Sequence, residues 1–367
     1  MGRPGRSVKC GRLCLEGTED AKARIASALR VGQREIEIDR CRYGPSRVMA
    51  RCTGNWKGKR FFAKILLADP FPVPARFTIP WEVPNGTPRP TRPVGDQIEI
   101  EWNMSLKMRS LSGGECVPAP LGRSVSARTI VWEEASGKPL VRLVKRTRWK
   151  RSVGATGSRK LFEAGEWLRR VHEASHQRDE TVNMLDLIDR ARNFARQKGP
   201  QISDYDRVVP KILEAALPTV GKGCFAVPVA FTHGDFCLAN LLWDGQGGSL
   251  AVVDFELSGV RNTYRDLFAL VGSLQSALLN PFIPKSVILA WERSFWRGYG
   301  PTSSQLKDFV RALALARVFY HHLSRFHKRR ESKGWISRIH AQLYRTFMEP
   351  KVIANRLDLP QFLKEFP

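Results

Sequence analysis

Three polar residues near the middle of the chain have the types and the order that phosphoryl transfer requires. Asp235 lies in a His-Gly-Asp turn, Asn240 follows it after a short loop, and Asp254 ends an apolar run. In this chemistry one carboxylate orients the acceptor hydroxyl and accepts its proton, while an Asn and a second Asp hold magnesium against the nucleotide phosphates. The order predicts Asp235 as the catalytic residue and Asn240 and Asp254 as metal ligands.

The residues between Asn240 and Asp254 predict a hairpin that brings these two side chains together. Residues 241–243 and 250–253 are apolar, as short buried strands are, and residues 244–248 are rich in Gly, as turns are. Because Mg²⁺ is a hard ion, an amide oxygen beside a carboxylate suits it. Each Asp alone would be an ordinary turn or cap residue, but the ordered combination favours a kinase site.

This pattern resembles the aminoglycoside phosphotransferase and choline kinase family of small-molecule kinases. The resemblance rests on His233-Gly234-Asp235, Asn240 and Asp254-Phe255-Glu256, and on the segment 259–270. It implies an α+β, protein-kinase-like two-lobed fold with a small β-rich N-lobe and a larger, mainly helical C-lobe, with ATP and Mg²⁺ as cofactors. It also implies that Asp266 begins a helix and braces the catalytic loop.

The chain departs from the family at Cys237-Leu238-Ala239, where many members have His, Pro and Gly. The metal ligands are unchanged, but the acceptor cannot be assigned from the closest relative. The resemblance divides the chain into a basic N-terminal extension (1–30), an N-lobe (31–132) and a C-lobe with the catalytic loop and a helical C-terminus (133–367). Eight prolines in 69–93 exclude a continuous helix or a central strand there, so this stretch reads as an insertion in the N-lobe.

A kinase-like N-lobe should supply a lysine on a strand for the α and β phosphates. Residues 34–40, 47–52 and 60–66 read as three successive strands, and Lys64 on the third is the candidate. The plainer interpretation of Lys64 is a solvated strand lysine. Its partner should be a glutamate of the following segment, 98–111, whose apolar positions mix helical and strand periods. Glu101 is the choice, and Glu99 is the rival because an error in helix phase exchanges them.

The segment around 127–140 resembles the family crossover between the lobes. Main-chain groups of this crossover hydrogen-bond the adenine edge, which predicts Glu133, Glu134 and Ala135 as the nucleotide-facing stretch. Apolar residues at helical spacing in 161–171 predict the long helix that follows. Gly44, Gly54 and Gly58 are scattered, so the sequence assigns no phosphate-binding glycine loop.

The net charge of +25, from 60 basic and 35 acidic residues, implies a negatively charged partner or surface. Basic clusters at 145–151 and 325–333 could meet an anionic membrane surface, a phosphorylated glycan or a nucleic acid, or could be ordinary solvated surface. A polycationic aminoglycoside matches such a protein poorly. The charge therefore favours a hydroxyl of a sugar or glycolipid of the cell surface, in the manner of lipopolysaccharide-core sugar kinases, over an aminoglycoside or choline.

Seven cysteines without zinc-ligand spacing favour reduced thiols and a cytoplasmic protein, with peripheral contact at the inner membrane face if the basic clusters bind lipid. The basic start of the chain has no apolar core and does not read as a secretory signal. Two other classes remain as alternatives. A pseudokinase scaffold predicts the loss of at least one of Asp235, Asn240 and Asp254, and all three are present. A nucleic-acid-binding protein would explain the charge but leaves this triad unexplained, so nucleic acid is not the expected partner.

Overall fold

The chain folds into two compact units in the computed structural model. Unit 1 comprises Met1–Arg76, Thr87–Ser136 and Ala251–Leu257, and unit 2 comprises Phe77–Gly86, Gly137–Leu250 and Ser258–Pro367. The structure describes residues 11–12, 18–43, 49–69, 71–72, 91–146, 152–198, 213–214, 224–245, 249–278 and 283–330. In this part of the chain, no helix combines the length and the apolar character that a membrane crossing needs.

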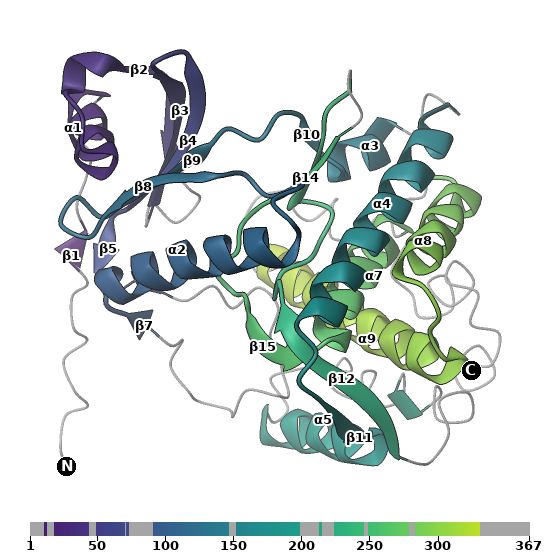
Figure 1. Cartoon of the computed structure of the whole chain (residues 1–367). Coiled ribbons are helices and arrows are strands. Elements are labelled where there is room, and N and C mark those ends of the chain that lie inside the picture. The colour runs from purple at the N-terminus through teal and green to yellow at the C-terminus, as the bar shows by residue number, and fades with distance from the viewer. Residues whose placement is uncertain are drawn as a thin grey trace, which may run out of the picture. The chain divides into compact units, whose positions relative to one another are not determined.

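Unit 1 is built on a five-stranded antiparallel sheet of order β2-β3-β4-β9-β8 (Figure 1). Its strands are β2 (Ile36–Tyr43), β3 (Met49–Trp56), β4 (Lys59–Leu66), β8 (Pro120–Ser124) and β9 (Thr129–Glu133). The three N-terminal strands predicted from the sequence are therefore present, with boundaries shifted by a few residues. Short pairs join β1 (Gly11–Arg12) to β5 (Ala68–Asp69) and β6 (Phe71–Pro72) to β7 (Thr91–Arg92), and a 3₁₀ turn covers Gln33–Glu35.

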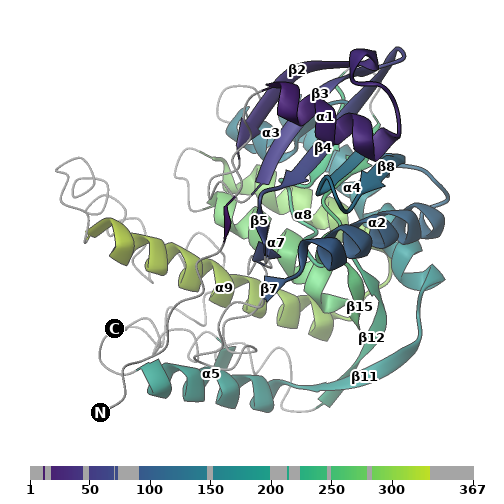
Figure 2. The same cartoon turned by 90° about the vertical axis from the view of Figure 1, so that its left-hand side faces the viewer.

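Two helices cover this sheet through separate cores. Helix α1 (Thr18–Leu29) packs with Phe61, Ala63 and Ile65 of β4, and Figure 2 shows it lying along strands β2 to β4. Helix α2 (Val94–Leu111) packs with Leu66 and residues of β9 in a second core. Alternate residues of a strand point to opposite faces, so β4 divides its side chains between the two helices.

The predicted extension, N-lobe and C-lobe divide the chain at other points than the two compact units do. Residues 18–29, assigned to a basic extension, form α1, because Ala21, Ile25, Ala28 and Leu29 make an apolar stripe that the sheet buries. Residues 133–136 and 251–257, assigned to the C-lobe, cluster with unit 1. Most of the Pro-rich insertion predicted at 69–93 lies outside the described residues.

Unit 2 is mainly helical. Helices α4 (Ser152–Ala174) and α8 (Lys285–Tyr299) run side by side, and α7 (Tyr264–Leu278) packs with α9 (Ser304–Arg330) (Figure 1). Helices α3 (Val141–Arg146) and α5 (Met184–Lys198) also belong to this unit. The Ser303 hydroxyl accepts the Leu306 N–H at 3.1 Å, so Ser303 caps the N-terminus of α9.

The strands of unit 2 carry the predicted catalytic loop. Strand β12 (Cys224–Thr232) pairs antiparallel with β11 (Arg178–Asn183) and β15 (Gly259–Asn262), and β10 (Lys138–Pro139) pairs with β13 (Leu241–Trp243). The returning strand β14 (Leu250–Val252) begins in unit 2. The Asp244 N–H donates to the Ser249 carbonyl at 3.4 Å, so both strands of the expected hairpin are present.

One pair of cysteines differs from the expectation of reduced thiols. The register of β2 and β3 places Cys41 directly opposite Cys52, with their Cα atoms 4.1 Å apart, and the two are joined by a disulfide. Cys116, Cys224 and Cys237 are thiols. Because the register alone brings the two sulfurs together, the pairing needs only an oxidising environment.

Candidate active site

Lys64 points to the side of the sheet that α2 covers, and the alternation of β4 explains why. Ala63 and Ile65 face the core shared with α1, whereas Leu66 faces the core shared with α2. Lys64 is two residues from Leu66 and so shares its face. The side chain is buried, with 2% of the residue exposed, and a buried ammonium requires anionic partners.

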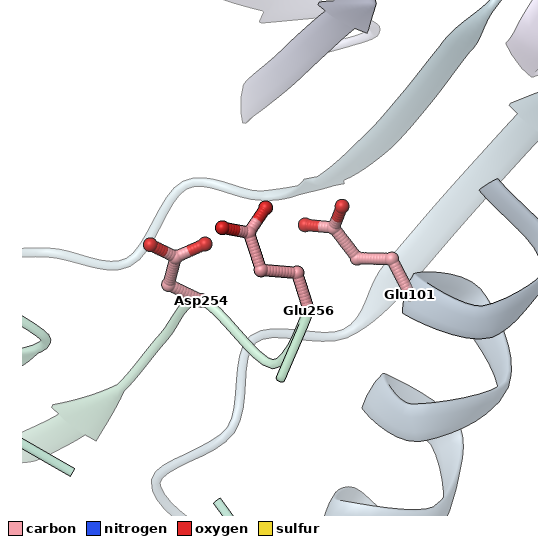
Figure 3. Close-up of side chains that lie close together, drawn as sticks. All are labelled: Glu101, Asp254 and Glu256. Atoms are coloured by element: carbon pink, nitrogen blue, oxygen red, sulfur yellow. The ribbon is translucent and has the colours of Figure 1, made fainter. Parts of the chain in front are cut away.

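Three carboxylates surround the Lys64 ammonium within unit 1. Nζ donates to both carboxylate oxygens of Glu101 at 3.0 Å, donates to Glu256, and lies 3.7 Å from Asp254 Oδ1. Figure 3 shows the three acids converging, Glu101 from α2 and the other two from the segment after β14. The Lys64 ammonium is therefore shared among three acids.

The phase of α2 decides between the two glutamates considered from the sequence. Glu101 is buried against Lys64, whereas Glu99 is half-buried and accepts from Arg123 Nε at 2.7 Å. Two residues on a helix differ by about 200° in direction, so only one of these glutamates can face the sheet. The sequence left the phase open because the apolar positions of this helix mix two periods.

Burial and charge act in opposite directions on the groups of this cluster. Burial alone would lower the pKa of Lys64, but Glu101, Glu256 and Asp254 outweigh it and raise that pKa. Burial raises the pKa of Glu101 to about 7, and attraction to Lys64 offsets this only in part. The carboxylates thus compete for one ammonium, and a further cation would relieve their repulsion.

The oxygen donors of this cluster fit a hard divalent cation. One oxygen from each of Glu101, Asp254 and Glu256 lies within 4.8 Å of the others. Carboxylate oxygens are the ligands that Mg²⁺ accepts, together with water and phosphate. Asp254 also has φ of 74°, a left-handed conformation that is uncommon for a residue with a side chain and is one of the strained conformations that cluster at functional sites.

In unit 2, Asp266 fixes the loop that carries Asp235. It lies in the first turn of α7 and is fully buried. Its Oδ2 accepts the His233 N–H at 2.7 Å and its Oδ1 accepts the Gly234 N–H at 2.8 Å. Gly234 has φ of 81°, which glycine adopts without strain. The turn is therefore held from one carboxylate, in the bracing position that the resemblance implies.

A second set of contacts supports this brace. The His172 side chain of α4 places Nε2 3.2 Å from Asp266 Oδ2 and Nδ1 3.0 Å from the Tyr299 hydroxyl. Phe236 of the loop is buried and stacks on Trp167 at a centroid distance of 5.7 Å. His172 is thus a buried, hydrogen-bonded support, and the loop is anchored on both sides of Asp235.

Asn240 and Asp235 belong to the same buried loop. Asn240 Nδ2 donates to the Asp235 main-chain carbonyl at 3.0 Å, which orients the amide so that its oxygen is the group available to a cation. Asp235 acts electrostatically on two buried neighbours. Burial and the Asp235 charge raise the pKa of Cys237 to about 12, and burial lowers the pKa of Arg317 to about 10, opposed by attraction to Asp235.

The predicted adenine-facing stretch ends β9 in unit 1. The Glu133 N–H donates to the Ala119 carbonyl at 2.8 Å and the Glu134 N–H donates to the Arg60 carbonyl at 3.0 Å. The Ala135 N–H makes no main-chain hydrogen bond to any other described residue. Of the main-chain N–H groups in this stretch, those of Glu133 and Glu134 are therefore already engaged within unit 1.

Two residues of these clusters received no role from the sequence. Glu256 was noted only as part of a motif, yet it bonds Lys64; its place directly after Asp254-Phe255 was the signal that it belongs to the same cluster. Arg317 lies in the middle of α9 and is buried over the Phe268 ring, and nothing in its spacing marked it. Gly44 and the side chains of both basic clusters, 145–151 and 325–333, lie outside the described residues.

Comparisons with known proteins agree with these motifs. The model of the phosphotransferase enzyme family matches residues 144–313. A search of curated proteins gives no match. Among solved structures, a choline/ethanolamine kinase family protein from Mesorhizobium loti is similar, with a TM-score of 0.50 at 14% identity, covering 95% of this chain and 99% of that one.

Two further solved structures are similar at lower scores. One is an aminoglycoside-3'-phosphotransferase of type VIII, with a TM-score of 0.45 at 16% identity over 82% of this chain and 98% of that one. The other is an amicoumacin kinase, with a TM-score of 0.48 at 14% identity, covering 92% of this chain and 96% of that one. The family match agrees with the resemblance predicted from the motifs, and the choline/ethanolamine kinase family structure confirms the kinase-like fold.

Proposed function

We propose that this protein transfers the γ-phosphate of ATP, with Mg²⁺, to a hydroxyl group of a small molecule. The observation that carries the proposal is the buried Lys64, bonded to Glu101 and Glu256 and 3.7 Å from Asp254. A lysine–glutamate pair beside a metal-binding aspartate is the arrangement that kinases require for nucleotide phosphates. Burying Lys64, Glu101 and Glu256 beside Asp254 without a charged ligand to bind would be hard to justify energetically.

Each residue has a definite part in the proposed reaction. Lys64 contacts the α and β phosphates, and the Ala135 N–H donates to the adenine edge. Asn240 and Asp254 hold Mg²⁺, which neutralises phosphate charge when it is bound. Asp235 orients the acceptor hydroxyl and accepts its proton as the bond to phosphorus forms. Asp266 keeps the Asp235 turn in place through two main-chain hydrogen bonds.

For the acceptor, we propose a sugar or the sugar portion of a glycolipid rather than a polycation. The excess of 60 basic over 35 acidic residues supports this class. Arg317 adds a local argument, since a buried guanidinium that interacts with Asp235 would repel a cationic acceptor at the carboxylate that must receive its proton. Peripheral contact with an anionic membrane through the basic clusters is part of the same proposal.

The test is turnover with labelled ATP and Mg²⁺ on a panel of neutral monosaccharides, lipopolysaccharide core oligosaccharide, choline and an aminoglycoside. Asp235→Asn should lower turnover by about 10²–10⁴-fold and leave nucleotide affinity within about threefold of wild type by calorimetry. Asp186→Asn, an exposed change in unit 2, is the matched control and should change neither quantity. Normal turnover by the Asp235 variant would remove that residue from the reaction.

A second variant tests the metal-ligand role of Asp254 independently of the proton-acceptor role of Asp235. Asp254→Ala should lose most of the Mg²⁺-dependent part of nucleotide affinity, because it removes a carboxylate from the cluster around Lys64. Unchanged Mg²⁺ dependence would contradict the metal assignment. If no acceptor is phosphorylated but ATP and Mg²⁺ still raise the melting temperature, the protein is the pseudokinase considered above. A rise in melting temperature with an oligonucleotide alone would favour nucleic-acid binding.

A further inference from the structure

Unit 1 contains a cavity of about 480 Å³ on the side of α2 that faces away from Lys64. Its walls come from the C-terminal end of α1, from α2, from β8 and from the turn that follows β8. This volume lies within the range of about 300–1,000 Å³ that small-molecule sites occupy. The lining residues are Ala28, Leu29, Arg30, Glu99, Trp102, Leu121, Gly122, Arg123 and Val125.

The main chain holds this cavity open. Helix α1 ends with the Val31 N–H donating to the Ala26 carbonyl at 3.0 Å and the Arg30 N–H donating to the Ser27 carbonyl at 3.3 Å, and Arg30 has φ of 58°. This is a Schellman ending with a left-handed residue. A Cβ on Gly122 of β8 would lie 2.3 Å from the Ala28 carbonyl oxygen. Helix and strand are therefore in backbone contact, and the wall is preformed.

The polar groups of the lining combine one aromatic ring with a net positive charge. The Arg123 guanidinium lies over the Trp102 ring, 4.8 Å from its centroid, and its Nε donates to Glu99 at 2.7 Å. These contacts hold Trp102 and Arg123 in place, and they pair the Glu99 carboxylate with Arg123. Arg30 is exposed and forms no ion pair within the described part of the chain, so its charge is the one left for a ligand.

We propose that this cavity binds a small aromatic anion, such as an aryl carboxylate or an aryl sulfonate. The ring packs among Trp102, Leu121 and Val125, and the anionic group pairs with Arg30 at the rim. Apolar walls supply most of the contact area in such sites, and a small number of placed polar groups fix the orientation. The wall that α1 and β8 preform reduces the ordering that binding would otherwise require.

Occupancy of this cavity should also act on the nucleotide site, and this step rests on the proposed function. Glu99 and Trp102 line the cavity from the same helix that presents Glu101 to Lys64. A ligand that fixes the position of α2 changes the Lys64–Glu101 pair, on which kinases depend. By linkage, the cavity ligand changes the affinity for ATP by the same factor by which ATP changes the affinity for the cavity ligand.

The probe is 8-anilinonaphthalene-1-sulfonate, an aryl sulfonate whose fluorescence rises in apolar sites, titrated into the full chain without nucleotide. Arg30→Glu reverses the rim charge, and Val125→Trp fills the cavity from a position that is 46% exposed. Each should weaken binding at least tenfold. Arg34→Glu makes the same charge change at an exposed residue outside the lining and should alter affinity by less than twofold.

Equal probe affinity in wild type, Arg30→Glu and Val125→Trp would overturn the proposal. If Val125→Trp fails to fold by circular dichroism, Arg30→Glu against Arg34→Glu decides alone. A titration of ATP with and without the probe then measures the coupling: a shift of threefold or more that Arg30→Glu abolishes supports it, and identical affinities refute it. Absent phosphotransfer with intact, Arg30-dependent probe binding would refute the kinase proposal and leave this site standing.

Discussion

Replacing Asp266 with Asn should destabilise unit 2 strongly, because a single carboxylate serves three partners. Its oxygens accept the His233 N–H at 2.7 Å and the Gly234 N–H at 2.8 Å, and His172 Nε2 lies 3.2 Å away. Asn has nearly the same volume but only one acceptor oxygen. Its amide would place N–H against N–H at one of the two main-chain donors, and both bonds would lose the carboxylate charge.

The magnitude follows from these contacts. A hydrogen bond to a charged group contributes about 1.5–3 kcal/mol, and a buried donor left without an acceptor costs about 1–3 kcal/mol. Loss of one bond and weakening of the other should lower the free energy of unfolding by about 3–5 kcal/mol. Urea denaturation followed by tryptophan fluorescence measures it, because Trp167 stacks on Phe236 of the same loop.

Asp189→Asn provides the control. Asp189 lies in α5 and accepts from Arg192 at 3.0 Å, but its side chain is 64% exposed, and exposed pairs contribute less than about 1 kcal/mol. Asp266→Asn should therefore be several-fold more destabilising than this change. If the two variants unfold at the same urea concentration, Asp266 does not brace the loop, and the argument for a preformed Asp235 turn fails with it.

The remaining predictions concern unit 1. The pKa of Glu101 is raised from 4.5 to about 7 in the folded protein, so its ionisation lowers the stability as the pH rises through this window. The wild type should therefore lose about 2–3 kcal/mol of unfolding free energy between pH 5 and pH 8, measured by urea denaturation, and Glu101→Gln should not show this loss. Gly54→Ala would place a Cβ 2.0 Å from a main-chain oxygen of β2 and should lower the melting temperature far more than Gly58→Ala, which meets no neighbour and pays only for its left-handed φ, about 1 kcal/mol. The disulfide between Cys41 and Cys52 should make the intact mass of the oxidised protein lighter by two hydrogens, and Cys41→Ser should abolish this difference; an unchanged mass on reduction of the wild type would contradict the pairing.

The sequence contained enough to predict the kinase-like fold and the strand that carries Lys64, because both depend on local patterns. The apolar run around Lys64, after two shorter strand-like segments, defined β4, and the Gly-rich turn between two apolar runs defined the hairpin after Asn240. The choice between Glu99 and Glu101 depended on the direction of one helix, which tertiary packing decides. The sequence could name both candidates but could not orient them.

Two features were missed for different reasons. Helix α1 was readable, since Ala21, Ile25, Ala28 and Leu29 follow helical spacing, but a basic start to the chain suggested an extension. Arg317 gave no local signal, because its environment is assembled from residues far away in the sequence, such as Asp235 and Phe268. Long-range electrostatics of this kind becomes visible only when the chain is folded.

The crowding of acids around Lys64 has a consequence for how a nucleotide would enter. The Lys64 ammonium already bonds Glu101 and Glu256. An incoming triphosphate must therefore compete for it with carboxylates that carry the same sign of charge. A bare nucleotide would meet repulsion there, whereas one that arrives with its divalent partner brings the compensating charge. We therefore expect metal-free ATP to compete poorly with the metal complex, and, because salt screens buried charges only weakly, we expect the gap between them to persist at high salt.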